Sequence, residues 1–168
     1  MVNALAAPDR MPVLMGSSGV GKSSLAQAGV LAALKRQSWP EQAQTGNAWP
    51  AVFRDSRRWC YLSLKPGTDP LKALVGSFVD TWQFAATDPV LADHQHGWVE
   101  RLRDGKATLS DLLDATERRR AELDQPKPAG FVLHVDQGEE LYVRAEERQR
   151  RQFSELFWKR WASHACAR

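Results

Sequence analysis

The amino-acid sequence predicts an α/β fold, in which helices cover a parallel β-sheet. The run from Phe131 to Val135 is apolar and rich in β-branched residues, as expected of a strand that is covered on both faces. Met11 to Met15 is a second short apolar run, and a glycine-rich turn and an amphipathic segment follow it. Strands that alternate with helices in this way are typical of parallel sheets.

Composition places the chain among globular proteins of one domain. It has 168 residues, of which 43% are hydrophobic and 26% are charged, and a domain takes about 150 residues. No apolar run reaches the roughly 18 residues of a membrane-spanning helix, and the first ten residues lack the basic leader and apolar stretch of a signal peptide. We therefore expect a cytoplasmic protein with no membrane partner.

Charge and cysteine content limit the kinds of ligand and the kinds of structural site that the protein is expected to have. Lys and Arg number 23 against 20 Asp and Glu, and the net charge of +3 permits an anionic ligand without indicating nucleic acid. Cys60 and Cys166 lie far apart and have no metal-ligand spacing, which argues against a disulfide scaffold or a zinc site.

The remaining elements follow from local signals. After Gly16, apolar residues recur at helical spacing over 24–36. Together with the apolar run before Gly16, this pattern predicts a strand, a tight loop and a helix in that order. Residues 37–56 contain proline and glycine and predict a long irregular connection. Arg58 to Leu64 predicts a second strand, because its residues are mostly apolar or aromatic and a Pro-Gly pair ends it.

Capping residues place the later helices. Asp69-Pro70 supplies an N-cap and a first helical proline for a helix over 70–82, and Asp88-Pro89 does the same for a helix to Arg103. A third helix begins after Thr108 or Ser110. The tail is expected to be helical from Arg144.

Residues 16–23 carry the strongest motif. They read Gly-Ser-Ser-Gly-Val-Gly-Lys-Ser and match Gly-x-x-x-x-Gly-Lys-Ser/Thr, the Walker A pattern of a P-loop, at every fixed position. A triphosphate is bulky and polyanionic, so its loop needs inward-facing backbone N–H groups, and glycines allow that conformation. The motif lies between the expected strand and helix that it requires. We therefore expect a three-layer α/β/α P-loop NTPase that binds a nucleoside triphosphate.

Each part of this loop has an expected role. Lys22 reaches the β- and γ-phosphates as a point charge and is a catalytic candidate, and Ser23 offers its hydroxyl to Mg²⁺. The helix that begins there points its positive end at the phosphates. The expected nucleotide-binding residues are Gly16, Ser17, Ser18, Gly19, Val20, Gly21, Lys22, Ser23 and Ser24.

An acidic cluster follows the apolar run from Phe131 to Val135. Asp136 stands directly after the expected strand, as in a Walker B element, and ligands of open parallel sheets bind at the carboxyl ends of strands. Asp136 is therefore the second expected Mg²⁺ ligand, beside Ser23. Glu139 and Glu140 are close enough along the chain to orient or deprotonate an attacking water. The alternative is that they only charge the start of the next helix, which the helix dipole also favours.

Four segments together resemble the STAND NTPases, specifically their novel STAND group. Besides the P-loop at 16–25, they are Ala-Gly-Val-Leu at 28–31, Lys-Pro-Gly-Thr-Asp-Pro-Leu at 65–71, and Val-Asp-Gln-Gly-Glu-Glu-Leu-Tyr at 135–142. The four occur in order over most of the chain. The third and fourth are more particular than the first, which many P-loop proteins share.

The resemblance implies an ATP-driven signalling switch of the ASCE type, related to NACHT ATPases. In such a switch the nucleotide state controls assembly, so self-association or a partner protein chain is implied. By the same likeness, Glu139 takes the place of the distal acidic residue that assists hydrolysis.

The chain departs from the family pattern in two ways. Gly138 stands where the family usually has an aromatic residue, and Ala32 stands where it usually has proline. Family members also continue into a strand with a polar or arginine sensor and into further effector regions. By this comparison, residues 1–168 are expected to be a partial NTPase core without these parts, incomplete at the C-terminus.

Two other functions fit the motifs. A small P-loop kinase shares the phosphate loop and roughly this length, but the region between Lys65 and Gly130 has no identifiable acceptor motif. A truncated nucleotide-binding fragment without turnover is the non-enzymatic alternative, because the expected sensor strand is missing.

Overall fold

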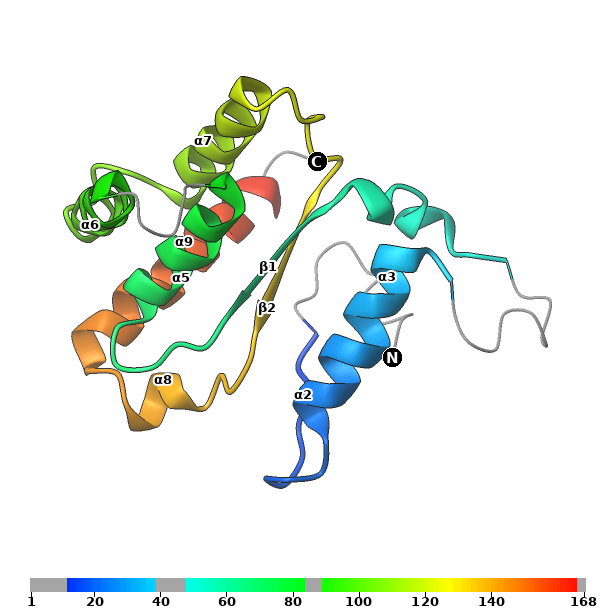
Figure 1. Ribbon diagram of the computed structural model, residues 1–168. Coiled ribbons are helices and arrows are strands. Elements are labelled where there is room, and N and C mark those ends of the chain that lie inside the picture. The colour runs from blue at the N-terminus through cyan, green and yellow to red at the C-terminus, as the bar shows by residue number, and fades with distance from the viewer. Residues whose placement is uncertain (1–11, 39–47, 84–88, 166–168) are drawn as a thin grey trace. The chain divides into compact units, whose positions relative to one another are not determined.

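The computed structural model describes residues 12–38, 48–83 and 89–165 (Figure 1). The chain forms two compact units. The first comprises Met1–Cys60 and Pro128–Val132, and the second comprises Tyr61–Lys127 and Leu133–Arg168.

A single run of helix dominates the described part of the first unit. It begins as α2 (Lys22–Ser24), continues as a π-helical segment, η1 (Leu25–Leu31), and ends as α3 (Ala32–Arg36). Gln37 ends the helix in a left-handed conformation, with φ of 55°. The helix expected over 24–36 is confirmed, and it starts two residues earlier.

Two short 3₁₀ turns follow, η2 (Ala51–Phe53) and η3 (Ser56–Arg58), and the carboxyl end of the helix packs on η3. The Ser56 hydroxyl donates to the carbonyl of Leu34 at 2.7 Å, and both residues are buried. Phe53 is also buried and meets the Trp59 ring edge to face. The irregular connection expected over 37–56 therefore contains short helical turns, and its residues 39–47 lie outside the described residues.

The strand expected over 11–15 is not formed by its described residues. Residues 12–15 have no regular structure. The side chains of Val13 and Met15 are exposed, at 71% and 85%. An apolar run becomes a strand only when its backbone groups pair with a neighbouring strand, and the sheet contains β1 and β2 alone among the described residues.

The sheet consists of β1 (Cys60–Leu64) and β2 (Phe131–Val135), and the two strands run parallel. The N–H of Cys60 donates to the Gly130 carbonyl at 2.9 Å, and the N–H of Asp136 donates to the Leu64 carbonyl at 2.9 Å. The second strand matches its expected bounds. The first begins at Cys60, because Arg58 is part of the preceding 3₁₀ turn.

Burial in β2 differs from the expectation. All five of its residues are half-buried, whereas a strand covered on both faces was expected. β2 pairs with one strand only in the described chain, so it lacks the second neighbour of a central strand.

Helices of the second unit connect and follow the strands. Between β1 and β2 come α5 (Pro70–Val79), η4 (Asp80–Trp82), α6 (Pro89–Arg103) and α7 (Leu109–Glu122), and after β2 come α8 (Glu140–Val143) and α9 (Glu147–Ala165). Figure 1 shows α5, α6, α7 and α9 gathered together, and α5 contacts the other three. The tail helix thus begins at Glu147 instead of Arg144, since Arg144 follows α8 in a turn.

The apolar face of α5 forms the centre of this core. Its fully or nearly fully buried side chains are Leu71, Leu74, Val75, Phe78 and Val79. Beyond them, the indole N–H of Trp82 donates to the Thr116 hydroxyl at 2.9 Å, and that hydroxyl donates to the Leu112 carbonyl at 2.9 Å. These bonds satisfy the buried polar groups and fix η4 against α7.

The N-caps expected at Asp69 and Thr108 are present, and the one expected at Asp88 lies outside the described residues. The Asp69 carboxylate accepts from the Lys72 N–H at 3.1 Å, with Pro70 at the first helical position. Thr108, and not Ser110, caps α7 in a reciprocal capping box with Asp111. The hydroxyl and N–H of Thr108 both bond the Asp111 carboxylate and lower its pKa.

The chain therefore has a mixed fold of helices and a two-stranded parallel sheet, which is compatible with an α/β NTPase-like architecture. Over the described residues, no helix is both long enough and apolar enough to cross a membrane.

The capping box of Thr108 and Asp111 is expected to stabilise the fold. Replacing Thr108 with Ala removes the acceptor for the Asp111 N–H, so the free energy of unfolding should fall by about 0.5–2 kcal/mol. Urea unfolding followed by circular dichroism measures it. Thr68→Ala, at an exposed position outside any helix, is the control and should change the free energy by less than about 0.5 kcal/mol. Equal effects of the two substitutions would contradict the cap.

Candidate functional site

The glycine-rich loop of the first unit turns sharply before its helix. Gly19 and Gly21 have φ of 81° and 82°, in the left-handed region that side chains with a Cβ disfavour. Gly21 is the N-cap of the helix, and its carbonyl accepts from the Leu25 N–H at 2.8 Å. The two glycines thus allow the chain to reverse directly into the helix that starts at Lys22.

Lys22 folds back over this loop. Its ammonium donates to the carbonyls of Gly16 at 2.6 Å and Ser17 at 2.7 Å. The backbone of the motif itself therefore holds the lysine charge against the loop. Neighbouring residues of the loop are exposed, while Lys22 and Ser23 are half-buried.

Asp136 lies at the carboxyl end of β2, in the second unit, and is buried with 7% of its surface exposed. The ammonium of Lys65 lies 3.7 Å from its carboxylate. A buried carboxylate needs such a cation or hydrogen bonds, because burial without compensation is costly. As expected from the sequence, Asp136 directly follows the strand β2.

Glu140 and Glu139 have different surroundings. The Glu140 carboxylate accepts from the Gly67 N–H at 3.1 Å and pairs with Arg144 at 3.3 Å, and its side chain is 15% exposed. Glu139 is exposed and is the N-cap of α8 without a side-chain capping bond. Glu140 therefore joins the turn after β2 to the turn after β1, and Glu139 faces solvent.

Two side-chain pairs lie along the same face of the strands. Ser63 Oγ is 2.9 Å from His134 Nδ1, and the Lys65–Asp136 pair comes two residues further along both strands. Residues two apart in a strand point to one face. Sequence reasoning missed Lys65 as a site residue, although it directly follows β1 as Asp136 follows β2, and charged residues at neighbouring strand ends meet.

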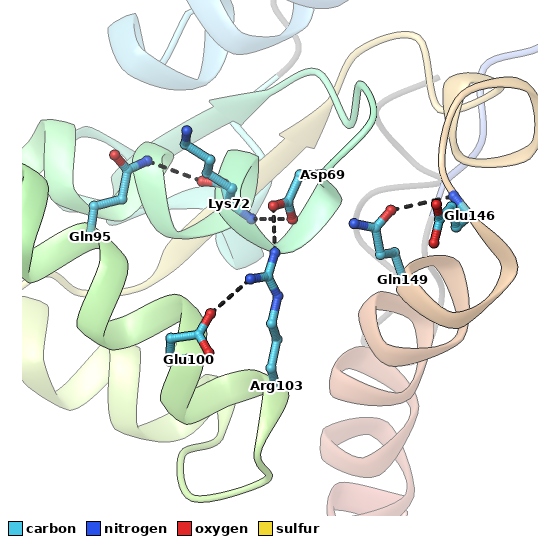
Figure 2. A network of polar contacts seen from close by, with 7 residues as sticks. All are labelled: Asp69, Lys72, Gln95, Glu100, Arg103, Glu146 and Gln149. Atoms are coloured by element: carbon cyan, nitrogen blue, oxygen red, sulfur yellow. Dashed lines mark hydrogen bonds and ion pairs between the residues drawn. The ribbon is translucent and has the colours of Figure 1, made fainter.

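A polar network holds the start of α5 in place (Figure 2). The Arg103 guanidinium pairs with Asp69 at 2.5 Å and with Glu100 at 2.8 Å. Partial burial lowers the pKa of Arg103, but the two carboxylates outweigh it and raise the pKa above its ordinary value. Gln95 donates to the Lys72 carbonyl at 3.3 Å. The N-cap of α5 is thereby fixed to α6.

An open groove of about 460 Å³ runs from the end of β1 along α5. Its charged lining residues are Lys65, Asp69, Lys72 and Asp80, and its polar ones are Ser63, Thr68, Ser77 and Gln95. Over the described residues, no group of three or more His, Cys, Asp or Glu side chains is arranged to hold a metal ion.

The structure thus gathers the sequence-predicted site residues in two places. Those of the P-loop lie together in the first unit, and Asp136, Glu139 and Glu140 lie together in the second.

Comparison with protein families identifies the chain. The model of the family "Novel STAND NTPase 1" matches residues 1–167. The chain belongs to this family. Membership indicates a nucleotide-binding protein. Searches of curated proteins and of solved structures gave no match.

Because their contacts differ, Glu140 and Glu139 are expected to contribute differently to the stability of the fold. Glu140→Ala removes a half-buried carboxylate that holds a backbone N–H, so the free energy of unfolding should fall by about 1.5–3 kcal/mol. Glu139→Ala is the matched control, and a solvent-facing change there should cost less than about 0.5 kcal/mol. Thermal and urea unfolding of both variants measure the difference, and a larger loss in the Glu139 variant would overturn this assignment.

Proposed function

We propose that the chain binds ATP with Mg²⁺ through the P-loop and hydrolyses it slowly, as the nucleotide-controlled part of a signalling or assembly switch. The observation that carries the proposal is the conformation of residues 16–24, in a chain of the STAND NTPase family. A three-layer α/β/α core of the ASCE type and control of assembly with a partner chain, or with further copies of this chain, are parts of the same proposal.

The loop suits a polyphosphate for three reasons. Its left-handed glycines at 19 and 21 remove side chains from the turn, and no heavy atom lies within 4 Å of where their Cβ atoms would be. Lys22 places a positive charge on the loop, where carbonyls hold it at 2.6 and 2.7 Å. The helix from 22 to 36 begins at the loop, and the positive end of its dipole favours an anion.

Phosphate oxygens would replace the loop carbonyls as the partners of Lys22. An ammonium that bonds charged oxygens makes stronger hydrogen bonds than one that bonds neutral carbonyls. The other loop residues, from Gly16 to Ser24, would contribute backbone N–H groups.

Each of the two proposed Mg²⁺ ligands has an oxygen donor, the kind of ligand atom that this ion prefers. Ser23 follows Lys22 in the motif, and Asp136 is a buried carboxylate whose charge already has a cationic partner. Mg²⁺ prefers oxygen ligands, usually one or two from the protein and the rest from phosphate and water. When bound, the ion would neutralise charge on the β- and γ-phosphates.

Glu139 is the better candidate for activating water, and Glu140 for positioning. Glu139 is exposed and follows the buried Asp136 three positions later along the chain. Glu140 already holds Gly67 and Arg144, so its carboxylate is occupied by structural bonds. A general base must reach the attacking water, which a solvent-facing carboxylate can do without breaking contacts.

Lys22→Ala tests the loop. The substitution removes its side-chain charge, and charge-assisted bonds contribute about 1.5–3 kcal/mol, so ATP affinity should fall by about tenfold or more. Isothermal titration with Mg²⁺ present measures it. Lys35→Ala, an exposed lysine near the other end of the same helix, removes the same charge and should leave the affinity within about twofold. Unchanged affinity in Lys22→Ala would remove the P-loop from the proposal.

Glu139→Gln tests hydrolysis. It keeps the size of the side chain but not its basicity, so phosphate release should fall by about 100-fold or more while ATP binding is retained. Glu140→Gln should reduce the rate less, because the amide oxygen still accepts from Gly67. Steady-state phosphate release measures both rates. Equal rates in the wild type and Glu139→Gln would exclude this residue as the base.

A further inference from the structure

The geometry points to Lys65 as a positioning residue of the Asp136 carboxylate that competes with Mg²⁺ for it, and so sets how strongly nucleotide binding depends on the metal. This inference rests on the proposed function. It concerns a residue outside both nucleotide motifs, on the turn between β1 and α5.

The strand register places Lys65 beside Asp136. The N–H of Asp136 donates to the carbonyl of Leu64, the residue before Lys65, at 2.9 Å. Two residues earlier on each strand, Ser63 and His134 meet at 2.9 Å. The Lys65 ammonium and the Asp136 carboxylate, 3.7 Å apart, continue this row of cross-strand pairs.

The turn that carries Lys65 is held from the other side as well. The Gly67 N–H donates to the Glu140 carboxylate at 3.1 Å, and Asp69 is fixed by Arg103 at 2.5 Å. Lys65 therefore extends from a backbone with anchors at positions 64, 67 and 69. Its ammonium returns to Asp136 whenever that carboxylate lacks another cation.

The two partners differ in exposure, which makes Lys65 the one that moves. The Asp136 side chain is 9% exposed and the Lys65 side chain is 58% exposed. A buried carboxylate retains its need for a positive partner, whereas a lysine on the surface can return to water at small cost. Mg²⁺ and an ammonium near one carboxylate repel each other. Binding of the metal therefore has to displace Lys65.

Lys65→Met tests the inference, because it keeps the length of the side chain and removes its charge. For each variant, ATP affinity is measured by titration with Mg²⁺ and again with EDTA, and the ratio of the two affinities gives the metal dependence. Exposed ion pairs contribute little, so the ratio should rise by about two- to fivefold in Lys65→Met. Lys65→Gln, a second neutral variant, should behave in the same way if the methionine variant does not fold.

Three controls separate competition from a change in overall charge. Lys65→Arg keeps the cation and should keep the wild-type ratio. Lys72→Met removes a lysine of the same groove that has no ion pair with Asp136 among the described contacts, and it should also keep the ratio. In an Asp136→Asn background, Lys65→Met should have no further effect, since the shared carboxylate is gone.

The outcomes distinguish this inference from the proposed function. If the wild type binds ATP and its ratio is unchanged or lower in both neutral variants, Lys65 does not compete with the metal and the inference is overturned alone. If Lys72→Met raises the ratio equally, the effect is one of overall charge and the inference is again overturned. If the wild type binds no ATP under either condition, the proposed function fails and this inference fails with it.

Discussion

The hydrogen bond from the Asp136 N–H to the Leu64 carbonyl sets the arrangement of the acidic cluster. It fixes the register at the carboxyl ends of β1 and β2. A shift of one residue in either strand would turn its side chains to the opposite face. Lys65 and Asp136 would then point away from each other, and so would Ser63 and His134. The charge balance of a buried carboxylate thus depends on a backbone bond between residues that are more than seventy positions apart.

The acidic residues after β2 differ in their burial and in their contacts. Asp136 is buried and holds a cation, while Glu140 is bonded to a backbone N–H and to Arg144. Glu139 has neither kind of contact among the described residues. Adjacent carboxylates of the same chemistry therefore differ in how firmly their surroundings hold them. Their order along the sequence does not reveal this difference, but the bonds of each side chain do.

Local features of this fold could be predicted from the sequence, and long-range ones could not. Asp69-Pro70 marked a helix start correctly, and so did Thr108, one of two caps that the sequence left open, because capping involves residues three positions apart. Glycines of the P-loop were likewise expected to allow left-handed conformations, and Gly19 and Gly21 adopt them. The pairing of Lys65 with Asp136 needs the register of two strands, which no local pattern encodes. The strand predicted from the apolar run at 11–15 is not formed by its described residues. An apolar composition alone does not supply the neighbouring strand that such a run needs.

The turn from Lys65 to Asp69 has a length that cannot change. Within five residues it leaves β1, presents an ammonium to Asp136, donates an N–H to Glu140, and caps α5 while pairing with Arg103. Surface loops ordinarily accept insertions because their ends alone are constrained. Here Lys65, Gly67 and Asp69 each have a separate partner, so one added residue would move at least one of them out of reach. For protein engineering, this turn is a poor place for a tag, a linker or a circularly permuted terminus, although it lies at the surface.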